Sequence, residues 1–218
     1  MNRADALERI LESGLVAVVR FEDPEPLVEA LTALAAGGIT VAEVTLTVPQ
    51  ALEVIRAARQ RLGERVLLGA GTVLDPEAAG AALLAGAEFI VAPTVNTEVI
   101  RLCRRYDKVV MPGAFTPTEI LTAWEAGADI VKVFPANVLG PEFFRAMRGP
   151  LPQIRLMPTG GVDLSTLGDY IAAGVACVGV GGQLLEPAAV AARQWDRLTE
   201  LARQYVQAVR QARQRRRT

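Results

Sequence analysis

Short apolar segments recur along the chain at a nearly constant interval, and this rhythm restricts the fold more than any other feature. Eight such segments begin at residues 15, 41, 66, 89, 109, 130, 155 and 177, spaced 20–26 residues apart. Continuous apolar runs such as Leu15–Val19 are typical of parallel strands that are covered on both faces. Two parallel strands need a crossover of a dozen or more residues, usually a helix. The interval therefore predicts eight βα units.

The segments between these strands have the apolar periodicity of helices, and several end in Ala-Gly before the next strand, where Gly supplies the left-handed helix stop. Eight such units close most economically into a (β/α)8 TIM barrel, which we expect to form one domain over residues 1–218. A doubly wound open sheet is the alternative. The unbroken rhythm and the lack of a Gly-rich nucleotide fingerprint after the first strand favour the barrel. Helices are expected at 2–14, 24–36, 49–62, 76–85, 96–106, 116–126, around 141–147, at 165–173, and from 187 to about 213 as one long helix or two.

Composition removes several classes of function. With 51% hydrophobic and 22% charged residues, the chain resembles a globular protein, and no apolar run is long enough for a membrane span. The N-terminal residues are too polar for a signal peptide, so a cytoplasmic location is expected. Histidine is absent, which removes the commonest general base and metal ligand. We therefore expect no metal.

Cysteine and charge patterns add little chemistry. Cys103 and Cys177 lie far apart in apolar surroundings, so a disulfide is not expected. The net charge of −1 gives no general reason to bind nucleic acid. The basic C-terminal tail is interpreted as a frayed helix end; its arginines are Arg210, Arg213, Arg215, Arg216 and Arg217.

Lys132 is the most unusual side chain of the sequence. The chain has only two lysines among 23 cationic residues, and this one is flanked by Val131 and Val133 in an apolar strand. In a strand it shares a face with Ile130 and Phe134, so its amine enters an enclosed space. Burial disfavours the charged form and leaves some neutral amine to attack a carbonyl. A buried ion pair, or a lysine that extends out to solvent at the strand end, is the alternative.

Glu43 is the second ionisable group inside an apolar strand, and it is expected to share a cavity with Lys132. A lysine that forms a Schiff base needs a nearby acid/base, and a partly buried glutamate can serve. The alternative is a purely structural ion pair between the two residues. In a barrel, further site residues lie at the C-terminal strand ends. Here these are Arg20, Thr47, Thr72, Pro93, Phe134 and Thr159.

Two glycine pairs follow the seventh and eighth strands, where barrels often bind phosphate. They are Gly160-Gly161 and Gly181-Gly182, each placed before an expected helical stretch. Glycine allows close backbone approach, and the amides of a helix N-terminus favour an anion. The pairs therefore predict a phosphate or carboxylate site.

Four motifs together resemble those of the 2-keto-3-deoxy-6-phosphogluconate (KDPG) aldolase / 4-hydroxy-2-oxoglutarate (KHG) aldolase family. They are Glu-Val-Thr-Leu at 43–46, Gly-Ala-Gly-Thr-Val at 69–73, Val-Lys-Val-Phe-Pro-Ala at 131–136 and Pro-Thr-Gly-Gly-Val at 158–162. The resemblance spans roughly residues 10 to 190. It implies a class I aldolase that needs no cofactor, usually a homotrimer, acting on a 2-keto acid and a phosphorylated aldehyde.

The resemblance also implies roles for individual residues. Lys132 matches the Schiff-base lysine and Glu43 the acid/base. The pyruvyl pocket would be lined by Thr72, Pro93, Phe134 and Thr159.

One position departs from the family pattern. Many members continue Glu-Val-Thr-Leu with an arginine that helps to hold the substrate, whereas this chain has Thr47 there. Arg20, after the first strand, is the nearest substitute. Two rival functions stay open: an isomerase or epimerase in which Lys132 never becomes covalent, and a non-catalytic sugar-phosphate binding barrel. No nucleic acid or membrane partner is expected.

Overall fold

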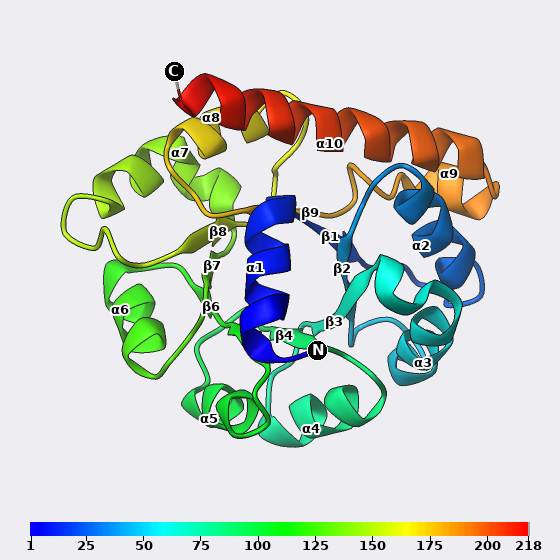
Figure 1. Ribbon diagram of the computed structural model, residues 1–218, viewed down its shortest axis with the longest axis horizontal. Coiled ribbons are helices and arrows are strands. Elements are labelled where there is room, and N and C mark those ends of the chain that lie inside the picture. Colours follow the sequence, from blue (N-terminus) through cyan, green and yellow to red (C-terminus); the bar gives the residue numbers. More distant parts are fainter. Residues whose placement is uncertain (218) are drawn as a thin grey trace.

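Parallel strands surrounded by helices form the body of the molecule (Figure 1). The computed structural model describes residues 1–217. One sheet has six strands in the order β5-β4-β3-β2-β1-β9, and a second has three in the order β6-β7-β8. Every strand pair is parallel. The strands are β1 (Leu15–Val19), β2 (Val41–Thr45), β3 (Leu67–Gly71), β4 (Phe89–Val91), β5 (Val109–Met111), β6 (Gly113–Ala114), β7 (Val131–Val133), β8 (Leu156–Pro158) and β9 (Val178–Val180).

The two sheets meet at both of their edges. Pro112, which has no N–H to donate, separates β5 from β6, and its carbonyl accepts a hydrogen bond from Lys132 N at 2.9 Å. At the other edge, an isolated parallel bridge between Thr159 and Gly179 joins the end of β8 to β9. The parallel sheet therefore curls around an interior, as expected for an α/β fold of repeated βα units.

Helices follow the strands in the expected alternation. They are α1 (Arg3–Ser13), α2 (Leu27–Ala36), α3 (Ala51–Leu62), the 3-10 helix η1 (Gly63–Arg65), α4 (Pro76–Leu84), α5 (Thr97–Arg105), α6 (Pro117–Glu125), α7 (Ala136–Met147), α8 (Leu167–Ala172), α9 (Pro187–Ala191) and α10 (Trp195–Arg217). Within residues 1–217, no helix has the length and apolar character needed to cross a membrane.

Burial separates the strand residues into two sets. Val131 and Val133 belong to the large core between strands and helices, whereas Ile130 belongs to a smaller cluster inside the curled sheet. This inner cluster also contains Ala6 and Ile10 of α1, which packs against the first residues of several strands. Helix α1 therefore closes the N-terminal end of the interior and leaves the C-terminal strand ends for a site.

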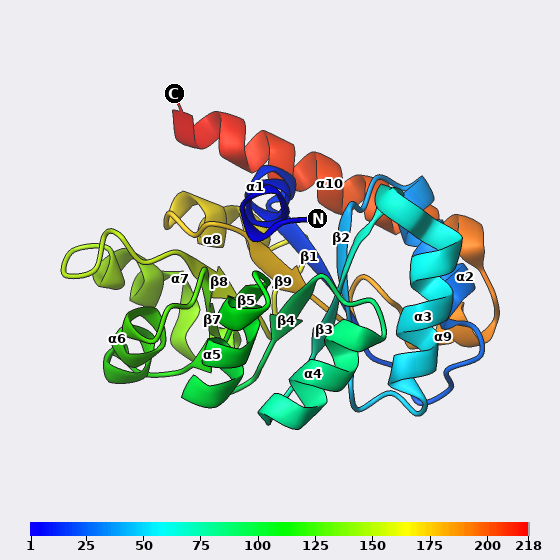
Figure 2. The same cartoon turned by 60° about the horizontal axis from the view of Figure 1, so that its bottom comes forward.

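Two helical expectations need correction. Helix α7 begins at Ala136 rather than near residue 141, and Gly140, with φ of 68° and ψ of 173°, divides it before Pro141. The C-terminal segment is two helices, α9 and α10, which is one of the two expected forms, but α10 continues to Arg217, past the expected end near residue 213. Helix α10 lies beside α1 (Figure 2). Arg213 of α10 donates hydrogen bonds to the carbonyls of Leu11 and Glu12 in α1, both at 2.7 Å.

Candidate active site

Lys132 lies at the middle of β7 and points into the interior. Its neighbours Val131 and Val133 face the helices, so alternation along the strand turns Lys132 to the same side as Ile130. The side chain is buried, with 4% exposure. Its Nζ lies 5.2 Å from the centroid of the Phe134 ring. The structure thus places the amine in a mostly apolar setting, not extended into solvent.

Glu43 reaches the same interior from β2, because Ala42 and Val44 on either side of it face the helices. It is 1% exposed, and neither carboxylate oxygen has a hydrogen-bond partner within residues 1–217. Gly71 on the neighbouring strand provides the room, since a Cβ there would lie 2.7 Å from Glu43 Oε1. A buried carboxyl group without a partner is rare in folded proteins and is available for a ligand.

The protonation of the two buried groups follows from their burial. Desolvation raises the pKa of Glu43, and the positive charges of Lys132 and Arg20 oppose this only in part. Desolvation likewise lowers the pKa of Lys132; the charge of Glu43 opposes this shift and that of Arg20 adds to it. No ion pair joins Lys132 to Glu43 in the described chain. The alternative of a structural ion pair is therefore not what the structure shows.

A cavity of about 160 Å³ opens above Lys132 at the C-terminal strand ends. It brings together eight of the predicted site residues: Arg20, Lys132, Phe134, Thr159, Gly160, Gly161, Gly181 and Gly182. The Oγ1 of Thr159 is buried without a hydrogen-bond partner in the described chain. Gly179 makes room for it, because a Cβ at that position would lie 2.4 Å from the hydroxyl. An unpaired hydroxyl and an unpaired carboxyl group thus lie at the cavity or just below it.

The glycine pairs line the cavity in loops. Gly160 and Gly161 have φ of 92° and 72°, conformations that favour glycine. Helix α8 begins only at Leu167, and the residues after Gly181 form a single turn closed by Leu184 N donating to Gly181 O at 2.8 Å. A helix follows each pair, as expected, but only after several loop residues: α8 begins at Leu167 and α9 at Pro187. The loop amides of the two pairs donate to no carbonyl within residues 1–217, so they can still receive an anion.

Besides Glu43, three predicted residues lie outside the cavity lining. Thr47 is exposed, and its hydroxyl is 2.9 Å from that of Thr45. Thr72 accepts a hydrogen bond from Arg20 Nη2 at 3.2 Å and so contacts the cavity through Arg20. Pro93 is partly buried behind Gly113, where a Cβ would lie 2.2 Å from its carbonyl carbon.

Sequence reasoning missed four lining residues: Val18, Val162, Gly179 and Gln183. Gln183 is the only one with a polar side chain, and it follows Gly182 in an exposed turn. Its place directly after a glycine pair was the available signal.

The fold and site define an α/β protein in which a buried lysine and a buried, unpaired glutamate share the interior of a curled parallel sheet. Residues 7–201 match the family model for KDPG and KHG aldolase, and the chain belongs to this family. The protein is therefore a lyase of the class that acts through a Schiff base.

Relatives share nearly the full chain. A 2-dehydro-3-deoxy-phosphogluconate aldolase from Treponema pallidum is 40% identical over 94% of this chain and 96% of its own. A second, from Pseudomonas aeruginosa, is 39% identical over 93% and 91%. Among solved structures, KDPG aldolase from Legionella pneumophila, with pyruvate captured as a covalent carbinolamine, has a TM-score of 0.85 at 29% identity, covering 91% of this chain and 96% of that one. A KDPGal structure has the same TM-score at 35% identity, covering 92% and 96%.

Proposed function

We propose that this chain is a class I aldolase that reversibly cleaves 2-keto-3-deoxy-6-phosphogluconate to pyruvate and glyceraldehyde 3-phosphate. The observation that carries the proposal is the buried Lys132, whose pKa is lowered by desolvation beside an unpaired Glu43. The Legionella relative, in which pyruvate forms a covalent carbinolamine, supports the same chemistry. 4-Hydroxy-2-oxoglutarate, cleaved to pyruvate and glyoxylate, is the second candidate substrate, in keeping with the family description.

The reaction begins at the amine of Lys132. Its neutral Nζ attacks the C2 ketone, and loss of water from the carbinolamine gives an iminium ion that accepts electrons. Glu43, directly or through a water, takes the proton of the C4 hydroxyl, the C3–C4 bond breaks, and the aldehyde leaves. The remaining enamine is protonated at C3. Hydrolysis of the iminium then releases pyruvate and restores the amine.

The raised pKa of Glu43 suits this role, because an acid/base works best when its pKa is near the operating pH. The carboxylate form of Glu43 accepts the proton of the C4 hydroxyl, and the carboxylic acid so formed donates a proton to C3 of the enamine. The residues that bind the rest of the substrate belong to the proposal as well. Arg20 and Thr72 hold the pyruvyl carboxylate, and the amides of the glycine pairs hold the phosphate.

The finer architecture is also proposed. If β5 and β6 count as one strand interrupted at Pro112, and the bridge from Thr159 to Gly179 as a closing contact, the strands make an eight-stranded barrel over a single domain.

We further propose a homotrimer in the cytoplasm. A solved cage built by fusing symmetric oligomeric domains, which aligns with 93% of this chain at a TM-score of 0.86, supports self-association.

Substitution of Lys132 tests the function. Lys132→Ala should remove pyruvate release from KDPG, measured in an assay coupled to lactate dehydrogenase. Lys132→Arg should be equally inactive, because a guanidinium stays protonated and does not attack a carbonyl. An isomerase or epimerase would release no pyruvate from KDPG even with Lys132 in place. Absence of pyruvate release by the parent protein would therefore refute the aldolase proposal, and substantial release by Lys132→Arg would refute the covalent role of Lys132.

A further inference from the structure

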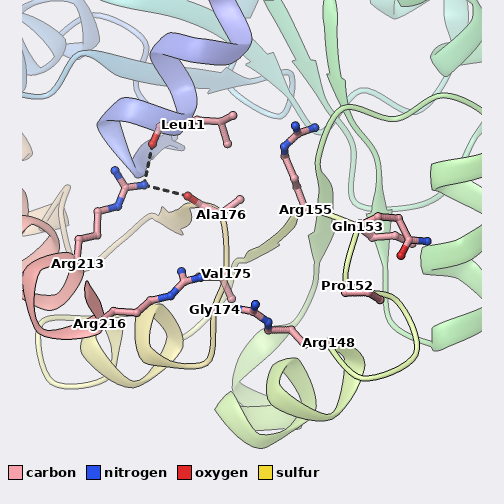
Figure 3. A pocket seen from close by; sticks show the side chains of 11 residues that line it. Leu11, Arg148, Pro152, Gln153, Arg155, Gly174, Val175, Ala176, Arg213 and Arg216 are labelled. Atoms are coloured by element: carbon pink, nitrogen blue, oxygen red, sulfur yellow. Dashed lines mark hydrogen bonds between the residues drawn. The ribbon is translucent and has the colours of Figure 1, made fainter. Parts of the chain in front are cut away.

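A second cavity lies among the residues that lead into β8 and β9 and the last turns of α10 (Figure 3). Its volume is about 620 Å³, and four arginines line it: Arg148, Arg155, Arg213 and Arg216. Arg155 directly precedes β8, whereas Thr159 of the catalytic cavity directly follows it. The two cavities therefore open at opposite ends of the same strand. The volume falls within the usual range for small-molecule sites, about 300–1,000 Å³.

The arginines come from three separate parts of the chain. Arg148 follows α7, Arg155 begins the approach to β8, and Arg216 lies on the last turn of α10. In Figure 3 the side chains of Arg148 and Arg216 extend toward one another across Gly174 and Val175. Such convergence gathers like charges, which is unfavourable unless an anion balances them.

Three of these guanidinium groups lack a counter-charge. Arg148, Arg155 and Arg216 have no side-chain hydrogen bond or ion pair within residues 1–217, and no acidic residue lines the cavity. Many other arginines do pair, for example Arg197 with Glu186 at 2.9 Å. Glu8 and Glu12 line two other depressions, one of which shares Leu11 and Arg213 with this cavity. The uncompensated charge is thus concentrated on the side of the cavity formed by Arg148, Arg155 and Arg216.

The fourth arginine and one glycine shape the cavity. Arg213 Nη2 donates to the carbonyls of Leu11 at 2.7 Å and Ala176 at 3.0 Å, which fixes the wall between α1 and α10. Gly174 has φ of 95°, and a Cβ there would lie 1.9 Å from Arg148 Nη1. The guanidinium of Arg148 therefore rests directly on the Gly174 backbone, which holds it at the cavity and limits its alternative conformations.

From this geometry we propose a binding site for a small ligand that carries two or more phosphate groups. Guanidinium groups bind phosphate oxygens through paired, charge-assisted hydrogen bonds, and three separated ones suit several phosphates better than one. The apolar lining, which includes Leu11, Pro152, Ile154 and Val175, can take an organic part of the ligand. The cavity is partly open, and Arg148, Arg155 and Arg216 are exposed at it, so a small ligand can reach all three guanidinium groups. The site is independent of the aldol reaction.

Isothermal titration with inorganic tripolyphosphate at low ionic strength tests the proposal on the full-length protein. The double variant Arg148→Gln/Arg216→Gln should weaken binding by roughly a hundredfold, about tenfold for each charge-assisted contact removed. Arg210→Gln is the matched control, because Arg210 is exposed on the same helix and lies outside the cavity lining. It should bind as the parent does. Titration with ATP in place of tripolyphosphate measures how much an organic part of the ligand adds to the affinity.

Two results would overturn the proposal. One is equal affinity for tripolyphosphate in the double variant and the parent. The other is displacement of tripolyphosphate by glyceraldehyde 3-phosphate, which would place it in the catalytic cavity. If the double variant does not fold, Arg155→Gln replaces it, since that side chain has no partner to lose. Duplex DNA that binds more tightly than tripolyphosphate and shows the same loss in these variants would also contradict a small-molecule site.

Discussion

Glu43 on β2 and Lys132 on β7 are both buried inside the curled sheet, yet no ion pair joins them in the described chain. Burial therefore moves the pKa of the carboxyl group up and the pKa of the amine down. A tight ion pair would fix both groups in their charged forms. Their separation leaves the amine free to react and the carboxyl group free to exchange protons with a substrate between them.

Glu43→Gln keeps the size of the side chain and removes its proton transfer. Turnover should fall by about 10²–10⁴-fold, the usual range for a general acid/base. Circular dichroism should show an unchanged fold, since the carboxylate has no partner to lose in the described chain. A decrease in kcat of less than about tenfold would reduce Glu43 to a structural residue.

The raised pKa of Glu43 also predicts a pH dependence of stability. Between the ordinary glutamate pKa of 4.5 and the raised pKa of Glu43, the folded protein binds a proton that the unfolded chain has released. The contribution of Glu43 to stability is thus full below 4.5 and lost as the pH rises through the folded pKa. As the pH rises through this window, the free energy of unfolding of the parent should fall relative to that of Glu43→Gln. Urea titrations at several pH values measure it, and a difference independent of pH would contradict the shift.

Gly71→Ala tests whether the position of Glu43 matters. The added Cβ would lie 2.7 Å from Glu43 Cδ and Oε1, so the carboxyl group must move. Overpacking of this kind typically costs about 1–3 kcal/mol, and kcat should fall as the acid/base leaves its place. Gly80→Ala is the control, because its Cβ meets open space and alanine favours helix α4. Equal kcat values in the two variants would show that the geometry at Gly71 is unimportant.

Arg20→Ala tests the substitute for the family arginine. Arg20 lines the catalytic cavity and donates to Thr72 Oγ1, whereas Thr47 lies outside the lining. In the synthetic direction the KM for pyruvate should rise about tenfold to a hundredfold, the equivalent of one charge-assisted contact. Adding Thr47→Arg to that variant should recover part of the loss. An unchanged KM would leave Arg20 as a solvated charge at the strand end.

Much of the fold was predictable from local pattern. Strand β1 begins at Leu15 and β2 at Val41, as expected, because apolar runs of that length have few alternatives between helices. The break at Pro112 and the division of α7 at Gly140 were not predicted. A proline at the end of an apolar run and a Gly-Pro step inside a helical pattern each permit several local structures, and packing decides between them.

The same limit applies to the site. Glu43 and Lys132 stand out in sequence because an ionisable group in an apolar strand must be buried. Gln183 gives no such signal, since polar residues in exposed turns are common. The arginine cavity is beyond sequence reasoning, because Arg148 and Arg216 are far apart in the chain and meet only through the packing of α10.

Borohydride reduction in the presence of pyruvate, followed by peptide mass mapping, tests the central claim most directly. The account predicts one reduced three-carbon adduct on the peptide that contains Lys132. Lys108, the second lysine of the chain, serves as the internal control: its Nζ lies 2.6 Å from Glu88 Oε2, and it should stay unmodified. An active preparation in which Lys132 carries no adduct after reduction would contradict the covalent mechanism.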